Sequence, residues 1–215
     1  MDVSVDQAGQ AFHAEDPVAD AAIRTALASL VSPGSFFTGA ERAAIATHAR
    51  LARGLATSAP ELPPVVAEAA ARVAADAIST RPSHIAAWEA DGRDVVAYVE
   101  LVAVTALICS IDSYRIGLGV PLDQLPDPVP GDPVPAVAEE ARKTNAWVPT
   151  VGVALAPTAM SALPNETATK AAVSKEWYLT DQVVHQYAVE PGRELSRPQM
   201  ELVAARTSWL NECFF

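Results

Sequence analysis

Hydrophobic residues recur at helical spacing along most of the chain, and capping residues mark where helices begin. Asp16 and Pro17 supply an N-cap acceptor and a proline for the first helical turn. Apolar side chains follow at positions 18, 22, 23, 27 and 30. This pattern predicts a first helix that ends at residues 32–35, after a loose leader over residues 1–15.

The most apolar segment, residues 95–116, is hydrophobic on nearly every side. Asp91 or Asp94 can cap it, and Gly117 and Gly119 follow it. A run of more than twenty residues without turn residues is too long for an ordinary strand. We therefore expect a central, buried helix.

Capping residues and helical spacing also predict several shorter helices. Thr38 with Glu41, and Ser196 with Gln199, have the spacing of capping boxes. The further helices expected are 43–56, 65–78, 82–90, 136–144, 169–187 and 198–210, with an irregular or loosely helical segment over 148–164.

The composition is that of a packed helical protein. Half of the 215 residues are hydrophobic, 19% are charged, and alanine, the best helix former, is the most frequent residue. We therefore expect an all-α helical bundle.

The net charge of the chain restricts which molecules it can bind. A net charge of −11 repels nucleic-acid phosphates and anionic lipid surfaces. We expect no uninterrupted apolar stretch of the roughly 18 to 20 residues that a bilayer crossing needs, and the N-terminus lacks the basic and apolar blocks of a signal peptide. The expectation is a cytoplasmic protein that binds neither nucleic acid nor membrane.

Two regions of the chain are related by a constant offset. The segment from Phe37 to Arg53 aligns with the segment from Leu195 to Asn211 when 158 positions separate them. Phe37 then matches Leu195, Ile45 matches Val203, and the two capping boxes coincide. The pattern predicts an internal repeat, although two capped alanine-rich helices share part of it by chance.

The segment from Leu195 to Cys213 resembles the opening of the redox motif in the alkylhydroperoxidase-like (carboxymuconolactone decarboxylase) family. In that family a Glu stands twelve residues before the first Cys of a Cys-x-x-Cys that a His soon follows, and Glu201 and Cys213 have that spacing. The stretches around Pro82 to Glu100 and Cys109 to Pro121 also resemble later helices of such a domain.

The resemblance implies a tandem protein of that all-α family. Residues 16–120 are then a degenerate first repeat, 121–135 a linker in which six residues are proline, and 136–215 the start of a second, incomplete repeat. In the first repeat the offset places Ala43, Leu55 and Ser58 where the family has its Glu and two Cys. That repeat is expected to have no redox chemistry.

The function implied is that of an antioxidant oxidoreductase, a peroxidase in which a thiol reductant restores the enzyme after a small-molecule hydroperoxide has oxidised it. Cys213 is the implied catalytic thiol and Glu201 the implied proton relay. Only Phe214 and Phe215 follow Cys213, so the motif is incomplete and the chain is expected to be inactive alone. On one straight helix the two residues would lie about 18 Å apart, so a relay needs a break in the chain.

Two alternatives stay open. One is a non-catalytic helical module that forms a homo-oligomer and buries the apolar run from Leu210 to Phe215. The other is a carboxymuconolactone decarboxylase-like enzyme, for which no set of polar catalytic groups stands out.

The remaining reactive residues have simpler interpretations. Cys109 lies among Leu107, Ile108 and Ile111 and is expected to be a buried structural thiol, unpaired with Cys213. His48, His84 and His185 lack zinc-ligand spacing, so neither a metal nor a cofactor is expected. Glu139, Glu140, Asp91 and Asp94 are expected to be solvated or capping charges.

Overall fold

The computed structural model describes residues 17–155, 158–177, 186 and 195–211, and within them it confirms the all-α fold. The described residues form seven α-helices and no strand. The helices are α2 (Pro17–Leu30), α3 (Gly39–Ala52), α4 (Pro64–Ala75), α5 (Pro82–Ala90), α6 (Val95–Leu118), α7 (Pro164–Trp177) and α9 (Arg197–Leu210), with a short 3₁₀ turn, η1, at Ala77–Ser79. The expected leader over 1–15 lies outside the described residues.

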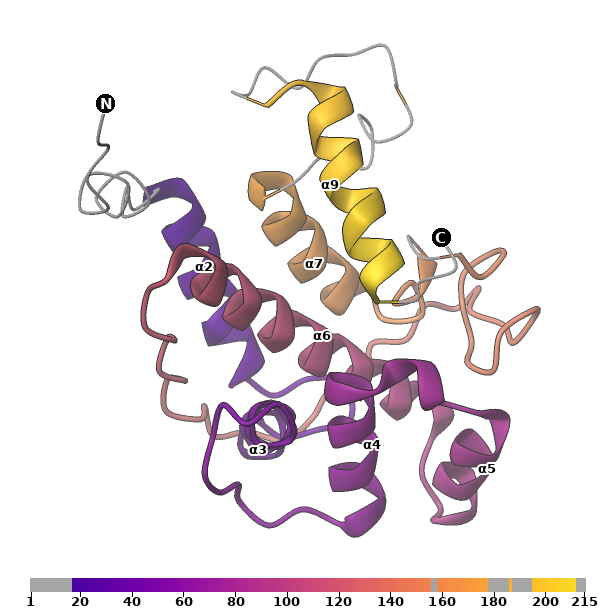
Figure 1. The fold of residues 1–215 in the computed structure, drawn as a ribbon. Coiled ribbons are helices and arrows are strands. Elements are labelled where there is room, and N and C mark those ends of the chain that lie inside the picture. The colour runs from indigo at the N-terminus through magenta and orange to yellow at the C-terminus, as the bar shows by residue number, and fades with distance from the viewer. Residues whose placement is uncertain (1–16, 156–157, 178–185, 187–194, 212–215) are drawn as a thin grey trace, which may run out of the picture.

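Helix α6 is the centre of the bundle. Helices α3, α4 and α5 lie on one side of it, while α7 and α9 lie on the other (Figure 1). Its apolar residues pack in one large core with those of α2, α3, α4 and α5. The largest fully buried apolar side chains are Trp88, Ile23, Leu30, Ile45, Leu101, Ile108, Ile111, Leu163, Val31 and Val66.

The capping signals locate the helix starts well. The Thr38 hydroxyl accepts the Glu41 N–H at 3.2 Å, and the Glu41 carboxylate accepts the Thr38 N–H at 2.8 Å. Asp94, one of the two expected caps, accepts the Val96 N–H at 2.7 Å and begins α6. Helix α3 ends at Ala52, before the expected Ala56, because Gly54 adopts a left-handed conformation with φ 71°.

By length and composition α6 could cross a membrane, although Glu100 interrupts its apolar run. Its most apolar window has a mean hydropathy of 2.0, and 67% of that window is buried inside the protein. The helix also carries Glu100 and Asp112, both fully buried and ion-paired to arginines of α3. Within the described bundle α6 is a core helix.

The expected helix at 136–144 is wrong. The backbone of this segment pairs with distant residues: Arg142 and Thr150 exchange both N–H···O bonds at 2.9 and 3.0 Å, and the Ala138 N–H binds the Ala162 carbonyl. Those bonds replace the local i→i−4 bonds that a helix requires. Of the two interpretations of 148–164, irregular or loosely helical, the described residues from 148 to 163 show the irregular one, and Pro164 begins α7.

Helix α7 begins at Pro164, five residues before the expected start at Thr169. Proline suits the first helical turn, where its missing N–H costs nothing. The rest of the expected helix, residues 178–187, lies outside the described residues apart from residue 186.

The proline-rich segment 121–135 lies against the first helices. Val129 and Val134 donate their N–H groups to the carbonyls of Val31 and Gly34 at 2.8 and 3.0 Å. Arg115 holds the Asp123 carboxylate at 2.7 Å, and Arg50 donates to the Asp123 carbonyl at 2.9 Å. These contacts fix the path of the segment without regular secondary structure.

Candidate functional site

The two implied catalytic residues are not brought together by the described part of the chain. Cys213 lies outside the described residues. Glu201 lies on α9, where its half-exposed carboxylate accepts a hydrogen bond from Arg197 Nε at 2.5 Å. This i, i+4 ion pair gives Glu201 a structural partner on its own helix.

Cys109 is a half-buried free thiol on α6. Burial raises its pKa, and the nearby positive charge of Arg53 offsets this only in part. Since the thiolate is the nucleophilic form, a raised pKa makes Cys109 a poor nucleophile. Its expected structural role agrees with this environment.

The two described histidines, His48 and His84, contact backbone groups through their side chains. His48 Nε2 lies 2.8 Å from the Pro60 carbonyl oxygen, and His84 Nδ1 accepts the Arg81 N–H at 3.0 Å. Among the described residues no group of three His, Cys, Asp or Glu side chains could hold a metal ion. His185 lies outside the described residues.

The main polar feature of the interior is a cluster that we call the charge triad: Arg42 of α3, Glu100 of α6 and Glu166 of α7. Arg42 Nη1 lies 2.5 Å from Glu100 Oε1 and 2.7 Å from Glu166 Oε1. Arg42 Nη2 also donates to Glu166 Oε2 at 3.3 Å. The three side chains are 2%, 0% and 8% exposed, so the triad joins three helices inside the protein.

Backbone groups complete the triad. The Phe36 N–H donates to Glu100 Oε2 at 2.7 Å. A Cβ atom at Gly34 would overlap the Glu100 carboxylate and the Arg42 guanidinium, so only glycine lets the backbone approach so closely. The turn between α2 and α3 is therefore shaped around this carboxylate.

Two carboxylates share one guanidinium in the triad, and this sets the direction of its pKa shifts. Burial raises the pKa of Glu100, and the charge and hydrogen bonds of Arg42 and Phe36 oppose this only in part. For Arg42 the balance is opposite, because Glu166 and Glu100 together outweigh the lowering effect of burial and raise its pKa. The triad therefore joins an arginine whose pKa is raised to a carboxyl group, Glu100, whose pKa burial also raises.

Sequence reasoning missed the triad because its members are far apart in the chain. Glu100 is 58 positions from Arg42, and Glu166 is 124. One signal was present: Glu100 is the sole charged residue in the apolar run 95–111. A charge in such a run is rarely buried without a partner.

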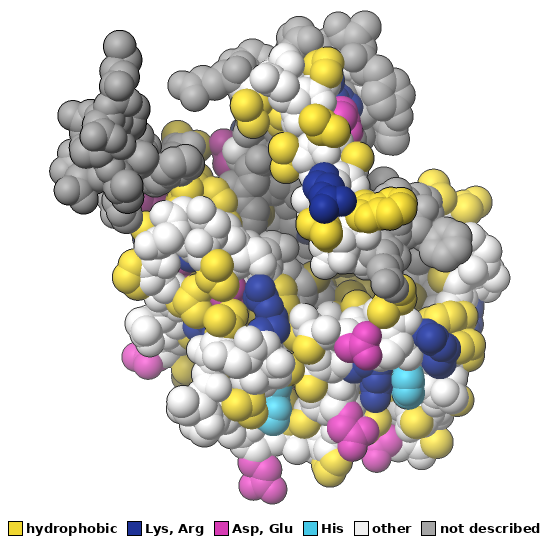
Figure 2. All heavy atoms as spheres, viewed as in Figure 1, with side chains coloured by type: hydrophobic (Ala, Val, Ile, Leu, Met, Phe, Trp, Pro, Cys, Tyr) yellow, Lys and Arg dark blue, Asp and Glu magenta, His cyan; other side chains and the backbone are white. Residues whose placement is uncertain are grey.

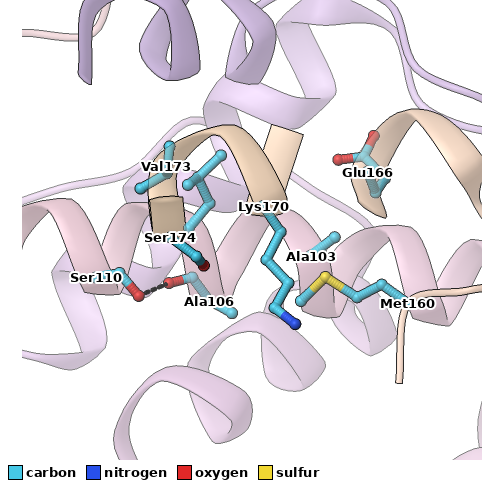
Figure 3. Close-up of a pocket in the computed structure, with 9 residues that line it drawn as sticks. Ala103, Ala106, Ser110, Met160, Glu166, Lys170, Val173 and Ser174 are labelled. Atoms are coloured by element: carbon cyan, nitrogen blue, oxygen red, sulfur yellow. Dashed lines mark hydrogen bonds between the residues drawn. The ribbon is translucent and has the colours of Figure 1, made fainter. Parts of the chain in front are cut away.

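A small cavity lies between α6 and α7, next to the triad (Figure 3). Its volume is about 190 Å³, and most of its lining is apolar. The α6 wall includes Ala103, Ala106 and Ser110, while Met160, Glu166, Lys170, Val173 and Ser174 form the other wall. In Figure 3 the Ser110 hydroxyl donates to the Ala106 carbonyl, at 2.8 Å.

The cavity offers little for catalysis. Both Glu166 oxygens are engaged by Arg42, and the Ser110 hydroxyl donates to its own helix. A nucleophile needs a base within hydrogen-bond reach, and these contacts supply none. The geometry suits a structural cavity.

Comparisons of this chain with protein-family models, with curated proteins and with solved structures give no match. What the protein does must therefore be inferred from its own residues.

Proposed function

We propose that this chain is an alkylhydroperoxidase-like helical protein that assembles with a second copy of itself through α9. The observation that carries the proposal is the exposed apolar face of this helix. Leu202, Val203, Trp209 and Leu210 are 71%, 61%, 76% and 65% exposed. Figure 2 shows hydrophobic side chains gathered on the projecting α9. A cluster of this kind is typical of an interaction surface.

The internal repeat identifies the face of α9 that a partner should cover. At the offset of 158, Val203 corresponds to Ile45 and Leu202 to Ala44, both on α3. Ile45 is 0% and Ala44 2% exposed, because α4 and α6 cover that side of α3. The same face of α9 is uncovered among the described residues. Burying it would remove several large apolar side chains from water.

Two observations favour a second copy of this chain as the partner that covers the exposed face of α9. The exposed apolar residues recur at heptad spacing: Leu202 is seven positions before Trp209, and Val203 is seven positions before Leu210. Residues at this spacing lie on one side of a helix and can pair with the same side of a second copy. Helix α9 also carries two arginines and one glutamate, while the whole chain has a net charge of −11. The net charge of this helix is +1, so two acidic copies that meet along it repel each other little there.

Light scattering after size exclusion tests the assembly. We expect the wild-type protein to have the mass of a homo-oligomer, and Val203→Glu to shift it toward the monomer because the substitution places a charge on the proposed interface. Val134→Glu is the matched control, since Val134 is 73% exposed in the proline-rich segment. A wild-type monomer at all concentrations, or equal masses for both variants, would contradict the proposal.

The second candidate function is thiol-dependent peroxide reduction at Cys213. In this reaction the Cys213 thiolate attacks the peroxide O–O bond, forms a sulfenic acid and releases an alcohol; a thiol reductant then regenerates the cysteine. The specific observation in its favour is the position of Glu201 on α9, where it is ion-paired with Arg197 and lies twelve positions before Cys213 in the sequence. An ionised carboxylate can accept the thiol proton.

Thiol titration over a range of pH, with intact mass after brief exposure to a hydroperoxide, tests this candidate. A Cys213 pKa well below the ordinary value of about 8.5, and one added oxygen that disappears in Cys213→Ser, would support it. A slow, ordinary thiol would leave the assembly function alone. The carboxymuconolactone decarboxylase-like alternative gains no supporting group from the described cavities.

A further inference from the structure

The proline-rich segment contains a short tandem repeat. The tetrapeptide Asp-Pro-Val-Pro occurs at residues 127–130 and again at 132–135, with Gly131 between the two copies. Every residue from 125 to 135 other than Gly131 is either a proline or directly precedes one. Proline fixes its own φ and keeps the residue before it extended. The sequence therefore holds both copies of the repeat in an extended conformation, within the coil that leaves α6 and passes α3 in Figure 1.

Both copies are attached to the bundle through the same backbone group, the N–H of their valine. The Val129 N–H donates to the Val31 carbonyl at 2.8 Å, just after α2. The Val134 N–H donates to the Gly34 carbonyl at 3.0 Å, in the turn between α2 and α3. At Gly39 a Cβ atom would lie 2.6 Å from the Val129 carbonyl oxygen, so the segment fits closely against the start of α3. A partner would meet a chain that is already ordered, which lowers the entropic cost of binding.

The side chains of the two copies are open to solvent. Val129 is 46% exposed and Val134 is 73% exposed. Asp127 and Asp132 are exposed as well, and neither forms an ion pair with a described residue. The repeat thus presents the same set of groups twice: a negative charge and an apolar side chain with a proline on each side of it.

The backbone of the repeat indicates which kind of partner can cover it. A partner that adds a β-strand needs N–H donors along the chain, but the prolines have none and the two valine N–H groups already bind the bundle. Extended proline-rich chains are instead bound in grooves lined by aromatic residues. Residues 121–135 include three aspartates and no lysine or arginine, so a complementary groove has a basic rim.

We propose that the two Asp-Pro-Val-Pro copies form a docking site for a partner protein that binds extended proline-rich chains in an aromatic-lined groove with a basic rim. The prolines and valines pack on the aromatic rings, while Asp127 and Asp132 face the basic residues. This docking site goes beyond the assembly and thiol functions proposed above and does not depend on them.

Calorimetric titration of the full chain with purified SH3, WW and EVH1 domains tests the docking site, because these three classes have aromatic-lined grooves. From each class one domain with a basic groove rim is used, with an acidic-rimmed domain of the same class as the matched control. We expect at least one basic-rimmed domain to bind saturably below about 1 mM, and its acidic-rimmed control to bind at least about tenfold more weakly. Poly-L-proline, which adopts the same extended conformation, should displace the bound domain.

Three results of this titration would overturn the proposal. They are no saturable binding by any of the basic-rimmed domains, equal binding of the acidic-rimmed controls, and binding that poly-L-proline does not displace.

Two double variants locate the site. Val129→Ser with Val134→Ser should weaken binding at least about tenfold and leave thermal unfolding unchanged, because both side chains are exposed. Asp127→Asn with Asp132→Asn should weaken binding and reduce its dependence on salt. Val153→Ser is the matched control, since Val153 is 63% exposed and lies outside the proline-rich segment. Unchanged affinity in both double variants would overturn the assignment.

Discussion

Helices α3 and α9 are two versions of one sequence pattern in different surroundings. Both span fourteen residues, and both follow a Ser or Thr cap. Yet α3 buries Arg42, Ala44, Ile45, Ala46 and Ala49, whereas α9 buries Arg197 and Met200 near its start and exposes most of the rest. The same local signals therefore produce a core helix in one place and a projecting helix in the other.

The difference shows what tertiary partners add to a helix. Helix α3 is held by apolar packing against α4 and α6 and by two buried ion pairs, Arg42 with Glu100 and Arg50 with Asp112. At the offset of 158, Met200 stands where α3 has Arg42. Helix α9 thus lacks the charge that ties α3 to the centre, and its stability depends more on local interactions.

The largest expected effect comes from replacing Arg42 of α3 with methionine, the residue that α9 has at the corresponding position 200. Arg42→Met leaves Glu100 and Glu166 buried without their shared cation, so we expect a loss of about 3–5 kcal/mol in the free energy of unfolding at neutral pH. Urea denaturation measures it. The control Arg206→Met, on the exposed side of α9, should stay within about 0.5 kcal/mol. Full stability in Arg42→Met would show that the triad is dispensable.

Truncation of one matched apolar pair compares the two helices directly. Ile45→Ala should lower the free energy of unfolding by about 2–5 kcal/mol, because Ile45 is 0% exposed. Val203→Ala, at the corresponding position of α9, should change it by less than about 0.5 kcal/mol at concentrations where the protein is monomeric. A large loss in Val203→Ala under those conditions would mean that its face is covered within one chain.

The caps provide a smaller contrast. Thr38→Ala removes a reciprocal cap in which Thr38 and Glu41 satisfy each other's N–H groups, and should cost about 1 kcal/mol. Ser196→Ala should cost less, since the exposed α9 contributes less to the cooperative core. Thermal unfolding of the two variants, followed by circular dichroism, compares them. The reverse order would indicate that α9 is the more tightly coupled helix.

The smallest expected effect is a change in how the free energy of unfolding depends on pH when Glu100 of the triad is replaced. Because the folded-state pKa of Glu100 is raised, the folded protein keeps a proton that the unfolded chain has already released. The stabilisation is present below the ordinary carboxyl pKa, near about 4.3, and is lost as pH rises through the raised folded value. Relative to Glu100→Gln, the wild type should therefore lose stability from acidic toward neutral pH.

Urea denaturation at several pH values follows this difference. Glu68→Gln is the control, since Glu68 is exposed on α4 and lies outside the triad. If the wild type instead gained stability relative to Glu100→Gln as pH rose, the ionised form of Glu100 would be the favoured one in the folded protein.

Local signals were enough wherever a structure depends on neighbours three or four positions apart. Pro82 and Gly92 bracket α5, and the Ser196 pattern places the start of α9 within one residue of its position. The segment 136–144 defeated the same reasoning, because its backbone bonds to residues 150 and 162 override its helical composition. Hydropathy alone likewise cannot tell whether α6 is a core helix or a membrane span, because hydropathy does not measure how much of the helix is buried in the protein.

The candidate sites divide in the same way. The spacing of Glu201 and Cys213, and the structural environment of Cys109, could be inferred from the sequence. The charge triad could not, because its members come from three helices that only folding brings together.

The sequence by itself determined that this protein is helical, where most helices begin, and which residues align at an offset of 158. Only the tertiary structure decided that Arg42 meets Glu100 and Glu166, and that the α3 face is covered while the α9 face is exposed. The physical reason is range. Caps and helical periodicity act over a single turn, whereas burial depends on which distant segments supply the opposing surface.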